Sequence, residues 1–382
     1  MTKAPSLMVI AGEVSGDMHA GALIRELKNR LPDLDVWGIG GDALEAEGVR
    51  IVYPVREMAV LGLAEVIQRY GFFRRVFREM VRKAEQERPD AVLLVDYPGF
   101  NLRFAREMKK RGIKVLYYVC PQVWAWHRSR IPKMAAIIDH LMVIFPFEVE
   151  VFAGTGLPTD FVGHPLVGET QAVLDAPNEL LPWPGTHKVA VMPGSRRQEL
   201  DRLLPAMMEA ARMLEDEDPE VGFLLAAASP EAERSILLRL SLIHEAQKPR
   251  RVKVVRGKTR EILKQADAAW VKSGTSTLEA ALMGCPMAVV YKTAALTYWM
   301  GRQLVQVPYL GMVNLLAGHE LCPELIQHQA NPKRLAETMR ALLMDEAARR
   351  TMRQGFADIR NQLGQYNAAE RAAAIVYKAL VA

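Results

Sequence analysis

The 382-residue sequence contains only three cysteines, and they are too few and too scattered for a disulfide framework. Cys120, Cys285 and Cys322 lie far apart, and no C-x-x-C pair of the redox or zinc-binding kind occurs. We therefore expect the chain to work in a reducing compartment.

Long hydrophobic runs are also missing. No stretch approaches the roughly 18 apolar residues that predict a membrane span. The apolar run that begins at Leu7 is too short for a secretory signal and lacks its cleavage pattern. The expectation is a cytoplasmic protein that contacts a membrane only from its surface.

Neither sign of charge dominates the composition. Lys and Arg number 49 against 44 Asp and Glu, a formal net charge of +5, which does not demand a polyanionic partner. No nucleic-acid partner is expected. Hydrophobic residues make up 50% and charged residues 24%, so the chain can bury large cores and is not disordered.

Several catalytic motifs are absent. The sequence has no G-x-x-x-x-G-K-[ST] loop, no H-E-x-x-H pair and no G-x-S-x-G elbow. Its eight histidines are scattered, so they indicate neither a metal cage nor a histidine-activated nucleophile. We expect no metal and no cofactor.

Short apolar runs alternate with longer amphipathic stretches, the pattern of parallel sheets covered by helices on both faces. This α/β pattern predicts two successive doubly wound units, with ligands in a cleft between them. The predicted strands are Leu7–Ala11, Val36–Ile39, Ala91–Val95, Lys114–Val119 and Leu141–Phe145, then Lys188–Met192, Gly222–Ala226, Val252–Val255, Ala268–Val271 and Met287–Tyr291.

The pattern is interrupted between Pro165 and His187, where prolines recur with little periodicity, and this predicts an interdomain linker. From Asn331 onward the sequence is helical. We place the first domain at 1–168, the second at 169–345 and the tail of helices at 346–382.

The segment A-G-E-V-S-G-D at 11–17 directly follows the first predicted strand. Its glycines permit a tight turn and a close approach of ligand to backbone, while Ser15 or Asp17 can cap the following helix. A plain capped turn is the alternative. Glu13, Asp17 and His19 together at a strand end favour a functional role, and Ser15 and Gly16 are candidate substrate contacts.

Asp96 ends the strongly apolar strand Ala91–Val95. A carboxylate at this position faces the cleft from a rigid element, and partial desolvation raises its pKa, as a general base requires. The alternative is that Asp96 caps the next turn.

Two tryptophans, Trp124 and Trp126, follow the strand at 114–119 in a proline-containing loop. They are costly to leave exposed, so they either pack into a core or wall a binding site.

Two loops of the second unit can bind phosphate. Each joins a strand to a helix, so backbone N–H groups, the helix dipole and a guanidinium converge there. A pyrophosphate cradle is predicted, with Glu279 on ribose hydroxyls; helix capping alone is the alternative. The candidate residues are Gly194, Ser195 and Arg196 in one loop, and Ser273, Gly274, Thr275 and Ser276 in the other.

The segment 68–83 predicts a basic amphipathic helix. It has six basic residues and one glutamate, so its net charge equals that of the whole chain. An apolar, aromatic side with an arginine row suits an anionic lipid interface, and the alternative is a surface helix that buries its apolar side in the core. The candidate membrane residues are Phe72, Phe73, Val76, Phe77, Arg74 and Arg78.

These motifs resemble those of the lipid-A-disaccharide synthases, inverting glycosyltransferases of bacterial lipid A assembly. The resemblance covers nearly the whole chain. It rests on A-G-E-V-S-G-D, V-D-Y-P-G-F-N, Y-Y-V-C-P-Q-V-W-A-W-H-R-S-R-I-P-K, F-P-F-E, V-G-H-P-L, M-P-G-S-R-R-Q-E, S-G-T-S-T-L-E-A-A-L-M-G-C-P-M and N-L-L-A-G-H-E-L-C-P-E-L-I-Q, in matching order.

The resemblance implies two Rossmann-like domains of the GT-B type, with the C-terminal helices crossing back onto the first domain. It implies transfer from UDP-2,3-diacylglucosamine to 2,3-diacylglucosamine 1-phosphate, giving the lipid A disaccharide 1-phosphate and UDP without a metal. Asp96 would be the base and Arg196 would stabilise the departing diphosphate. Glu13 would be a further catalytic residue, and Asn314 would bind substrate.

Acylated substrates imply peripheral contact with the cytoplasmic leaflet of the inner membrane, through the helix at 68–83. A homodimer is left open. A UDP-N-acetylglucosamine 2-epimerase is the main alternative, since it would share the architecture and the nucleotide site. A non-catalytic nucleotide-sugar sensor is another.

Overall fold

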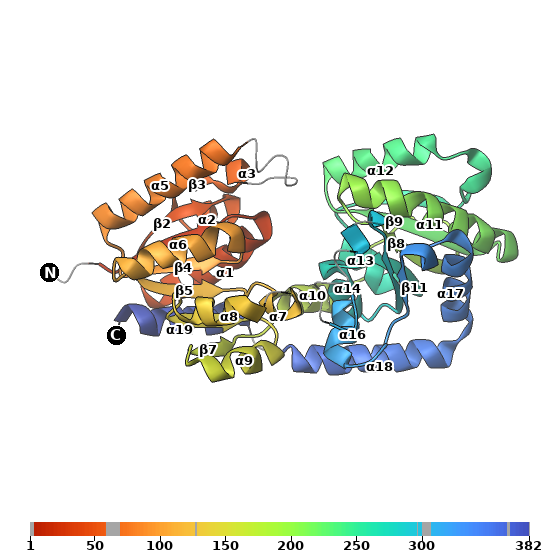
Figure 1. Ribbon diagram of the computed structural model, residues 1–382. Coiled ribbons are helices and arrows are strands. Elements are labelled where there is room, and N and C mark those ends of the chain that lie inside the picture. Colours follow the sequence, from red (N-terminus) through yellow and green to blue (C-terminus); the bar gives the residue numbers. More distant parts are fainter. Residues whose placement is uncertain are drawn as a thin grey trace. The chain divides into compact units, whose positions relative to one another are not determined.

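The computed structural model describes residues 4–58, 69–126, 128–295, 297–299, 307–364 and 367–381. It contains two compact units. Unit 1 comprises Met1–Gly168 and Leu363–Ala382, and unit 2 comprises Glu169–Gln362. Each unit is built around its own parallel sheet (Figure 1).

Unit 1 has a seven-stranded parallel sheet in the order β3-β2-β1-β4-β5-β6-β7. From β1 the chain adds β2 and β3 on one side of that strand, and it then adds β4 to β7 on the other side. The strand order therefore reverses between β1 and β4. The strands are β1 Ser6–Ala11, β2 Asp35–Gly40, β3 Arg50–Pro54, β4 Ala91–Val95, β5 Lys114–Tyr118, β6 His140–Val143 and β7 Thr159–Phe161.

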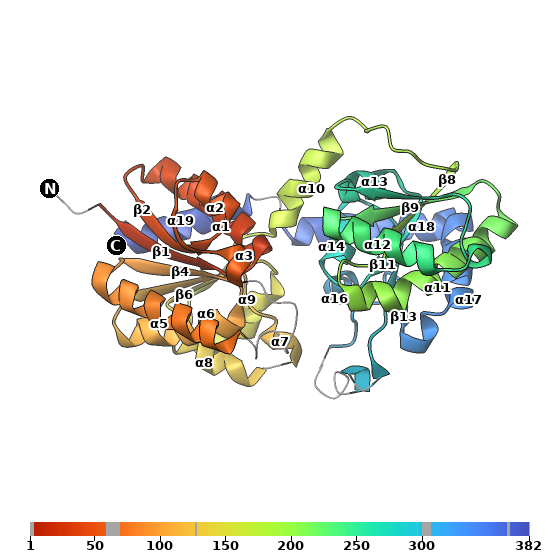
Figure 2. The same cartoon turned by 90° about the horizontal axis from the view of Figure 1, so that it is seen from above.

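Helices cover both faces of this sheet. Figure 2 shows α1 with α19 on one face and α5, α6 and α8 on the other. The helices of unit 1 are α1 Val14–Arg30, α2 Asp42–Ala46, α3 Val55–Met58, α5 Tyr70–Glu87, α6 Pro98–Lys110, α7 Val123–Trp126, α8 Ile131–Ala135, α9 Phe147–Phe152, α10 Pro165–Asp175, which continues into unit 2, and α19 Ala368–Val381.

Unit 2 repeats the design with six strands in the order β10-β9-β8-β11-β12-β13, which reverses between β8 and β11. Its strands are β8 His187–Met192, β9 Val221–Ala227, β10 Val252–Arg256, β11 Ala268–Lys272, β12 Met287–Tyr291 and β13 Glu324–Ile326. Its further helices are α11 Arg197–Glu217, α12 Pro230–Leu242, α13 Thr259–Gln265, α14 Thr275–Leu282, α16 Met312–Ala317, α17 Pro332–Met344 and α18 Glu346–Gln362.

The two-unit α/β fold predicted from the sequence is confirmed, with β4 and β12 at their predicted bounds. Strands β3, β7 and β13 were not predicted from the sequence. All three lie at sheet edges and are incompletely buried, so they lack the continuous apolar run that marks a central strand.

The segment predicted as a linker differs from the prediction, because its first half is the helix α10 and only the part that follows Asp175 is irregular. The tail differs as well. Helix α18 packs on α14, α16 and α17 of unit 2, whereas α19 packs on α1 of unit 1. The tail at 346–382 therefore divides between the two units.

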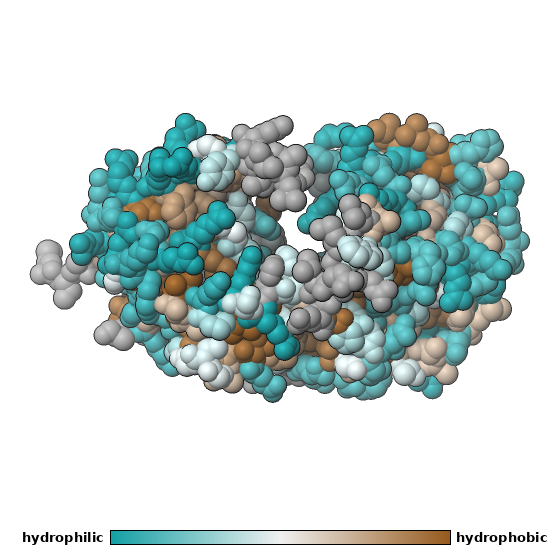
Figure 3. Space-filling view, viewed as in Figure 1, coloured by the Kyte–Doolittle hydropathy of each residue, from teal (hydrophilic) through white to brown (hydrophobic). Residues whose placement is uncertain are grey.

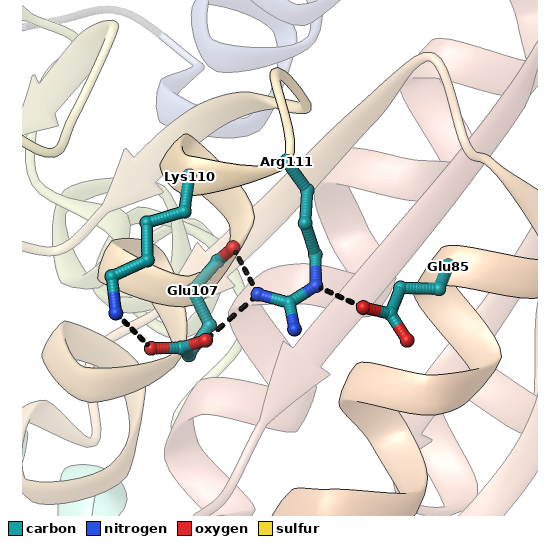
Figure 4. A network of polar contacts seen from close by, with 4 residues as sticks. All are labelled: Glu85, Glu107, Lys110 and Arg111. Carbon is teal, nitrogen blue, oxygen red and sulfur yellow. Dashed lines mark hydrogen bonds and ion pairs between the residues drawn. The ribbon is translucent and has the colours of Figure 1, made fainter.

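Arg111, just after α6, fastens α5 to α6 (Figure 4). Its guanidinium donates to Glu85 of α5 at 2.7 Å and to the Glu107 carboxylate at 2.7 Å, and Lys110 pairs with the same Glu107. This network holds the C-terminal ends of the two helices together.

Helix α12 buries only one side, where Ala232 and Ile236 face the core of unit 2. Leu237, Leu238 and Leu242 are exposed, and Figure 3 shows the hydrophobic surface over α12. This apolar strip was not anticipated from the sequence.

Candidate active site

In unit 1, the loops after β1 and β4 meet at the point where the strand order reverses. Ala11 is the register partner of Val95, so the residues that follow each strand emerge side by side. This switch point is where open α/β sheets bind ligands. Glu13 follows one strand and Asp96 follows the other, as the sequence predicted.

The backbone at the end of β4 is in a conformation that L-residues seldom adopt. Asp96 has φ +46° and Tyr97 has φ +49°. Asn101 of α6 is fully buried, and its Nδ2 donates to the Asp96 carbonyl at 2.8 Å. The Tyr117 hydroxyl donates to the same carbonyl at 2.6 Å. These two side chains fix the backbone from which the Asp96 carboxyl projects.

The Asp96 carboxyl holds its proton more tightly than an ordinary aspartate. Its pKa is raised from 3.8 to about 6, chiefly by burial and also by the negative charge of Glu13, while a backbone hydrogen bond at Tyr97 acts in the opposite direction. An acid with a pKa near 6 is ionised at neutral pH and remains a competent base.

The ring of Tyr97 leaves no room for a side chain at Gly12. A Cβ at position 12 would lie 2.2 Å from a ring atom of Tyr97, so no other residue fits. The Tyr97 hydroxyl donates to the Met58 carbonyl at 3.3 Å. Glu13 and Ser15, just beyond this contact, are exposed and accessible to a substrate.

Asp17 and Gly16, both predicted substrate contacts, are buried within unit 1. Asp17 is buried, and its carboxylate accepts from the N–H groups of Gly41 at 2.6 Å and Ala43 at 3.0 Å. It therefore caps the N-terminus of α2, and both its oxygens are in use. Gly16 is buried where α1 packs against Val95 of β4.

Trp124, also a predicted substrate contact, packs into the core, which was the alternative that the sequence left open. Its ring packs edge-on against Phe147, and its Nε1 donates to Glu148 at 3.1 Å. Burial raises the pKa of Glu148 to about 7. Trp126 is the exposed member of the pair, with half of its surface accessible.

In unit 2, the two predicted phosphate loops follow β8 and β11, which are hydrogen-bonded neighbours at the second switch point. The loops open α11 and α14, whose N-caps are Arg196 and Gly274. Ser195, Arg196, Gly274 and Thr275 are exposed, whereas Ser273 and Ser276 are half-buried. Gly194 has φ +96°, which favours glycine.

Glu279 and Ser273 are held in place by neighbours. Arg260 donates to Glu279 at 3.0 Å, and a second carboxylate, Glu169, pairs with the same guanidinium. The hydroxyl of Ser273 donates to the Leu310 carbonyl at 3.1 Å. Glu279 retains an oxygen that this ion pair does not use.

Asn314, a predicted substrate contact, is held by hydrogen bonds within unit 2. It is fully buried, and its Nδ2 donates to Cys322 O and to Glu324, while its Oδ1 accepts from the N–H groups of Leu321 and Cys322. With every hydrogen bond satisfied internally, it fastens α16 to the segment before β13.

The apolar side of α5 faces the core of unit 1, which was the alternative that the sequence left open. Val76 is fully buried, and Phe77 lies edge-on to Phe100 and Phe104 with centroids 5.3 and 5.8 Å away. Phe72 and Phe73 are half-buried against the same core. The exposed side is basic: Arg74, Arg75, Arg78 and Arg82, with Gly71 and Glu79, line a shallow hollow.

Within the described ranges, no group of three or more His, Cys, Asp or Glu side chains could hold a metal ion. No helix among those residues is both long and apolar enough to span a membrane.

Four residues that hold the site in place were given no role from the sequence. Tyr97 and Asn101 lie in the V-D-Y-P-G-F-N motif, Tyr117 opens the motif that begins Y-Y-V-C, and Glu148 ends F-P-F-E. The motifs mark these residues, but the partners of Tyr117 and Glu148 lie more than twenty residues away in the sequence, so their contacts could not be predicted.

Comparison with known proteins gives consistent matches along the chain. The family profile described as lipid-A-disaccharide synthetase matches residues 7–378. The lipid-A-disaccharide synthase of Geobacter metallireducens is 38% identical, covering 98% of this chain and 97% of the relative. That of Syntrophus aciditrophicus is 40% identical, covering 96% of each.

Among solved structures, the calicheamicin glycosyltransferase CalG4 aligns with a TM-score of 0.62 at 18% identity, covering 100% of this chain and 99% of that one. A putative UDP-N-acetylglucosamine 2-epimerase from Listeria monocytogenes aligns with a TM-score of 0.62 at 15% identity, covering 97% and 94%. At these identities the likeness shows the fold alone, which is the two-domain GT-B fold.

Proposed function

The chain belongs to the lipid-A-disaccharide synthase family and is a glycosyltransferase; from this premise we propose its substrates and the residues that act on them. The donor is UDP-2,3-diacylglucosamine and the acceptor is 2,3-diacylglucosamine 1-phosphate. The products are the β-1′,6-linked disaccharide 1-phosphate and UDP.

The main observation behind this proposal is the position and pKa of Asp96. Its half-buried carboxyl directly follows a central strand at the switch point of unit 1, and its pKa of about 6 suits a base at neutral pH. In the proposed reaction the carboxylate takes the proton of the acceptor 6-hydroxyl. The resulting oxygen nucleophile attacks the anomeric carbon, and the bond to UDP breaks with its electron pair, which inverts the configuration.

Unit 2 is proposed to hold UDP. Gly194, Ser195 and Arg196 would face the diphosphate, together with the loop at 273–276, and Glu279 would accept from the ribose hydroxyls. The mostly exposed Arg196 guanidinium and the N-termini of α11 and α14 would stabilise the charge that develops on the departing diphosphate. Glu13, whose charge acts on Asp96, is proposed to orient the acceptor.

Acceptor-dependent release of UDP tests this function. The purified chain is incubated with both substrates in detergent with a chelator, and UDP and disaccharide are measured with and without acceptor. The expected result is equal amounts of UDP and disaccharide, only when the acceptor is present. Epimerisation of UDP-N-acetylglucosamine supplied alone would instead establish the 2-epimerase alternative.

We also propose that the enzyme associates with the cytoplasmic leaflet of the inner membrane through the basic side of α5. Because Val76 is buried and Phe77 packs against the rings of α6, the proposed contribution of this helix is electrostatic attraction. The exposed arginines beside one shallow hollow fit anionic headgroups, each worth about 1 kcal/mol near an anionic surface.

Binding to vesicles with and without anionic lipid tests the membrane proposal. The double variant Arg74→Ser/Arg78→Ser should weaken binding to anionic vesicles about 30-fold, from the loss of two such charges. Arg334→Ser/Arg350→Ser is the matched control, because it removes two exposed arginines from unit 2. Equal binding by both double variants would refute the role of α5.

A further inference from the structure

An ion pair joins the two predicted phosphate loops of unit 2. Lys272, the last residue of β11, places its Nζ 2.8 Å from Oε1 of Glu199 in the first turn of α11. The two side chains are only 18% and 17% exposed. Neither residue has a role predicted from the sequence.

Three donor groups contact the Glu199 carboxylate. Besides Lys272, its Oε2 accepts from the backbone N–H of Arg196 at 3.3 Å, and the Arg196 guanidinium lies 3.5 Å from Oε1. The carboxylate also lies against Gly194, because a Cβ at that position would be 2.3 Å from Oε2. An anionic group of the chain itself therefore occupies the bend of the first loop.

These three donors are the types that bind phosphate in proteins: an ammonium, a guanidinium and an N–H at a helix N-terminus. The Lys272 ammonium also lies over the second loop, since a Cβ on Gly274 would be 3.4 Å from Nζ. One cation is thus within reach of both loops.

We propose that Lys272 is a further residue of the diphosphate site, and that its ammonium exchanges the Glu199 carboxylate for the diphosphate when the UDP-sugar binds. Glu199 is then a positioning residue: it holds Lys272 between the loops in the empty site and takes it back when UDP leaves. This inference rests on the proposed function, which assigns UDP to these loops.

Calorimetric titration of the full chain with UDP and with uridine tests the exchange. Lys272→Met keeps the length of the side chain and removes the charge, so the Kd for UDP should rise about 10-fold or more, as expected for one charge-assisted hydrogen bond. The Kd for uridine should not change, and Lys272→Arg should retain most of the affinity for UDP.

Glu199→Gln tests the other partner. Glutamine supports the same capping box at this position of a helix, so the variant removes the competing charge with little disturbance of the loop. Its Kd for UDP should fall several-fold. Lys188→Met, at the opposite end of β8, is the matched control and should bind UDP as the wild type does.

Three results would overturn the inference: wild-type affinity for UDP in Lys272→Met, a parallel loss of uridine and UDP affinity in that variant, or weaker UDP binding by Glu199→Gln. Each would leave the proposed function in place as long as the wild type binds UDP. Failure of the wild-type chain to bind UDP would instead overturn the proposed function.

Discussion

Asp96 combines burial, charge and an unusual backbone in one residue. Left-handed φ values at Asp96 and at Tyr97 each cost on the order of 1–3 kcal/mol, so the surrounding structure has to enforce them. Asn101 and Tyr117 do so by donating to the Asp96 carbonyl. Val119, directly after the neighbouring strand β5, is also left-handed, with φ +65°. Strain is thus concentrated where the candidate base lies.

The pH dependence of the rate follows from the pKa of Asp96. A base must be ionised to accept a proton, so kcat/KM should fall about tenfold per pH unit below about 6, measured as initial rates from pH 5 to pH 8. The same rate at pH 5 and pH 7 would exclude Asp96 as the base.

The same raised pKa affects stability in the opposite direction: the rate falls at low pH, whereas the stability contributed by this group falls at high pH. The folded state binds the Asp96 proton more tightly than the unfolded state, in which the pKa is near 3.8. The stability contributed by the protonated carboxyl is therefore present at low pH and lost as the pH rises from about 4 to about 6.

Asn101 is predicted to be a positioning residue. Asn101→Ala removes the donor to the Asp96 carbonyl, and the displaced carboxyl should lower kcat about 100-fold, while the Kd for UDP stays unchanged. Steady-state kinetics and UDP titration measure the two effects separately. Asn29→Ala, on the exposed side of α1, is the control. Wild-type kcat in Asn101→Ala would contradict the role.

The sequence predicted Asp96 because a carboxylate directly after an apolar strand is recognisable locally. The internal hydrogen bonds of Asp17, Trp124 and Asn314 could not be predicted, because their partners are distant in the sequence or belong to backbone that only folding brings near. A polar side chain in a motif has the same local pattern whether it contacts a substrate or holds a loop.

At the scale of elements, α5 shows what amphipathic periodicity predicts and what it leaves open. The apolar and basic sides of the helix are where the sequence placed them, but periodicity alone does not say what covers the apolar side. The structure covers it with Phe100 and Phe104 of α6. What remains of the membrane hypothesis is the basic side.

Phe77 should therefore contribute to stability. Phe77→Ala should lower the free energy of unfolding of unit 1 by about 2–4 kcal/mol, because it opens a cavity among packed aromatic rings. Arg78→Ala, one residue along and exposed, should change it by less than about 0.5 kcal/mol. Urea unfolding measures both. Equal stability of the two variants would show that Phe77 is not part of the core.

At the scale of the whole molecule, the same arrangement occurs twice. Each unit is a parallel sheet whose strand order reverses once, and in each the candidate residues follow the two strands at the reversal. Alternating patterns sufficed to predict both sheets, since central strands are continuously apolar. Of the four edge strands, β10 was predicted and β3, β7 and β13 were not, although all four are incompletely buried.

The turnover of Asp96→Asn, measured together with its affinity for UDP, is the most direct test of the proposed transfer. Asparagine keeps the shape of the side chain but cannot accept the proton. The predicted result is a kcat reduced about 10² to 10⁴-fold with the wild-type Kd for UDP. A variant that forms disaccharide at nearly the wild-type rate would contradict the assignment of the base and of the site in unit 1.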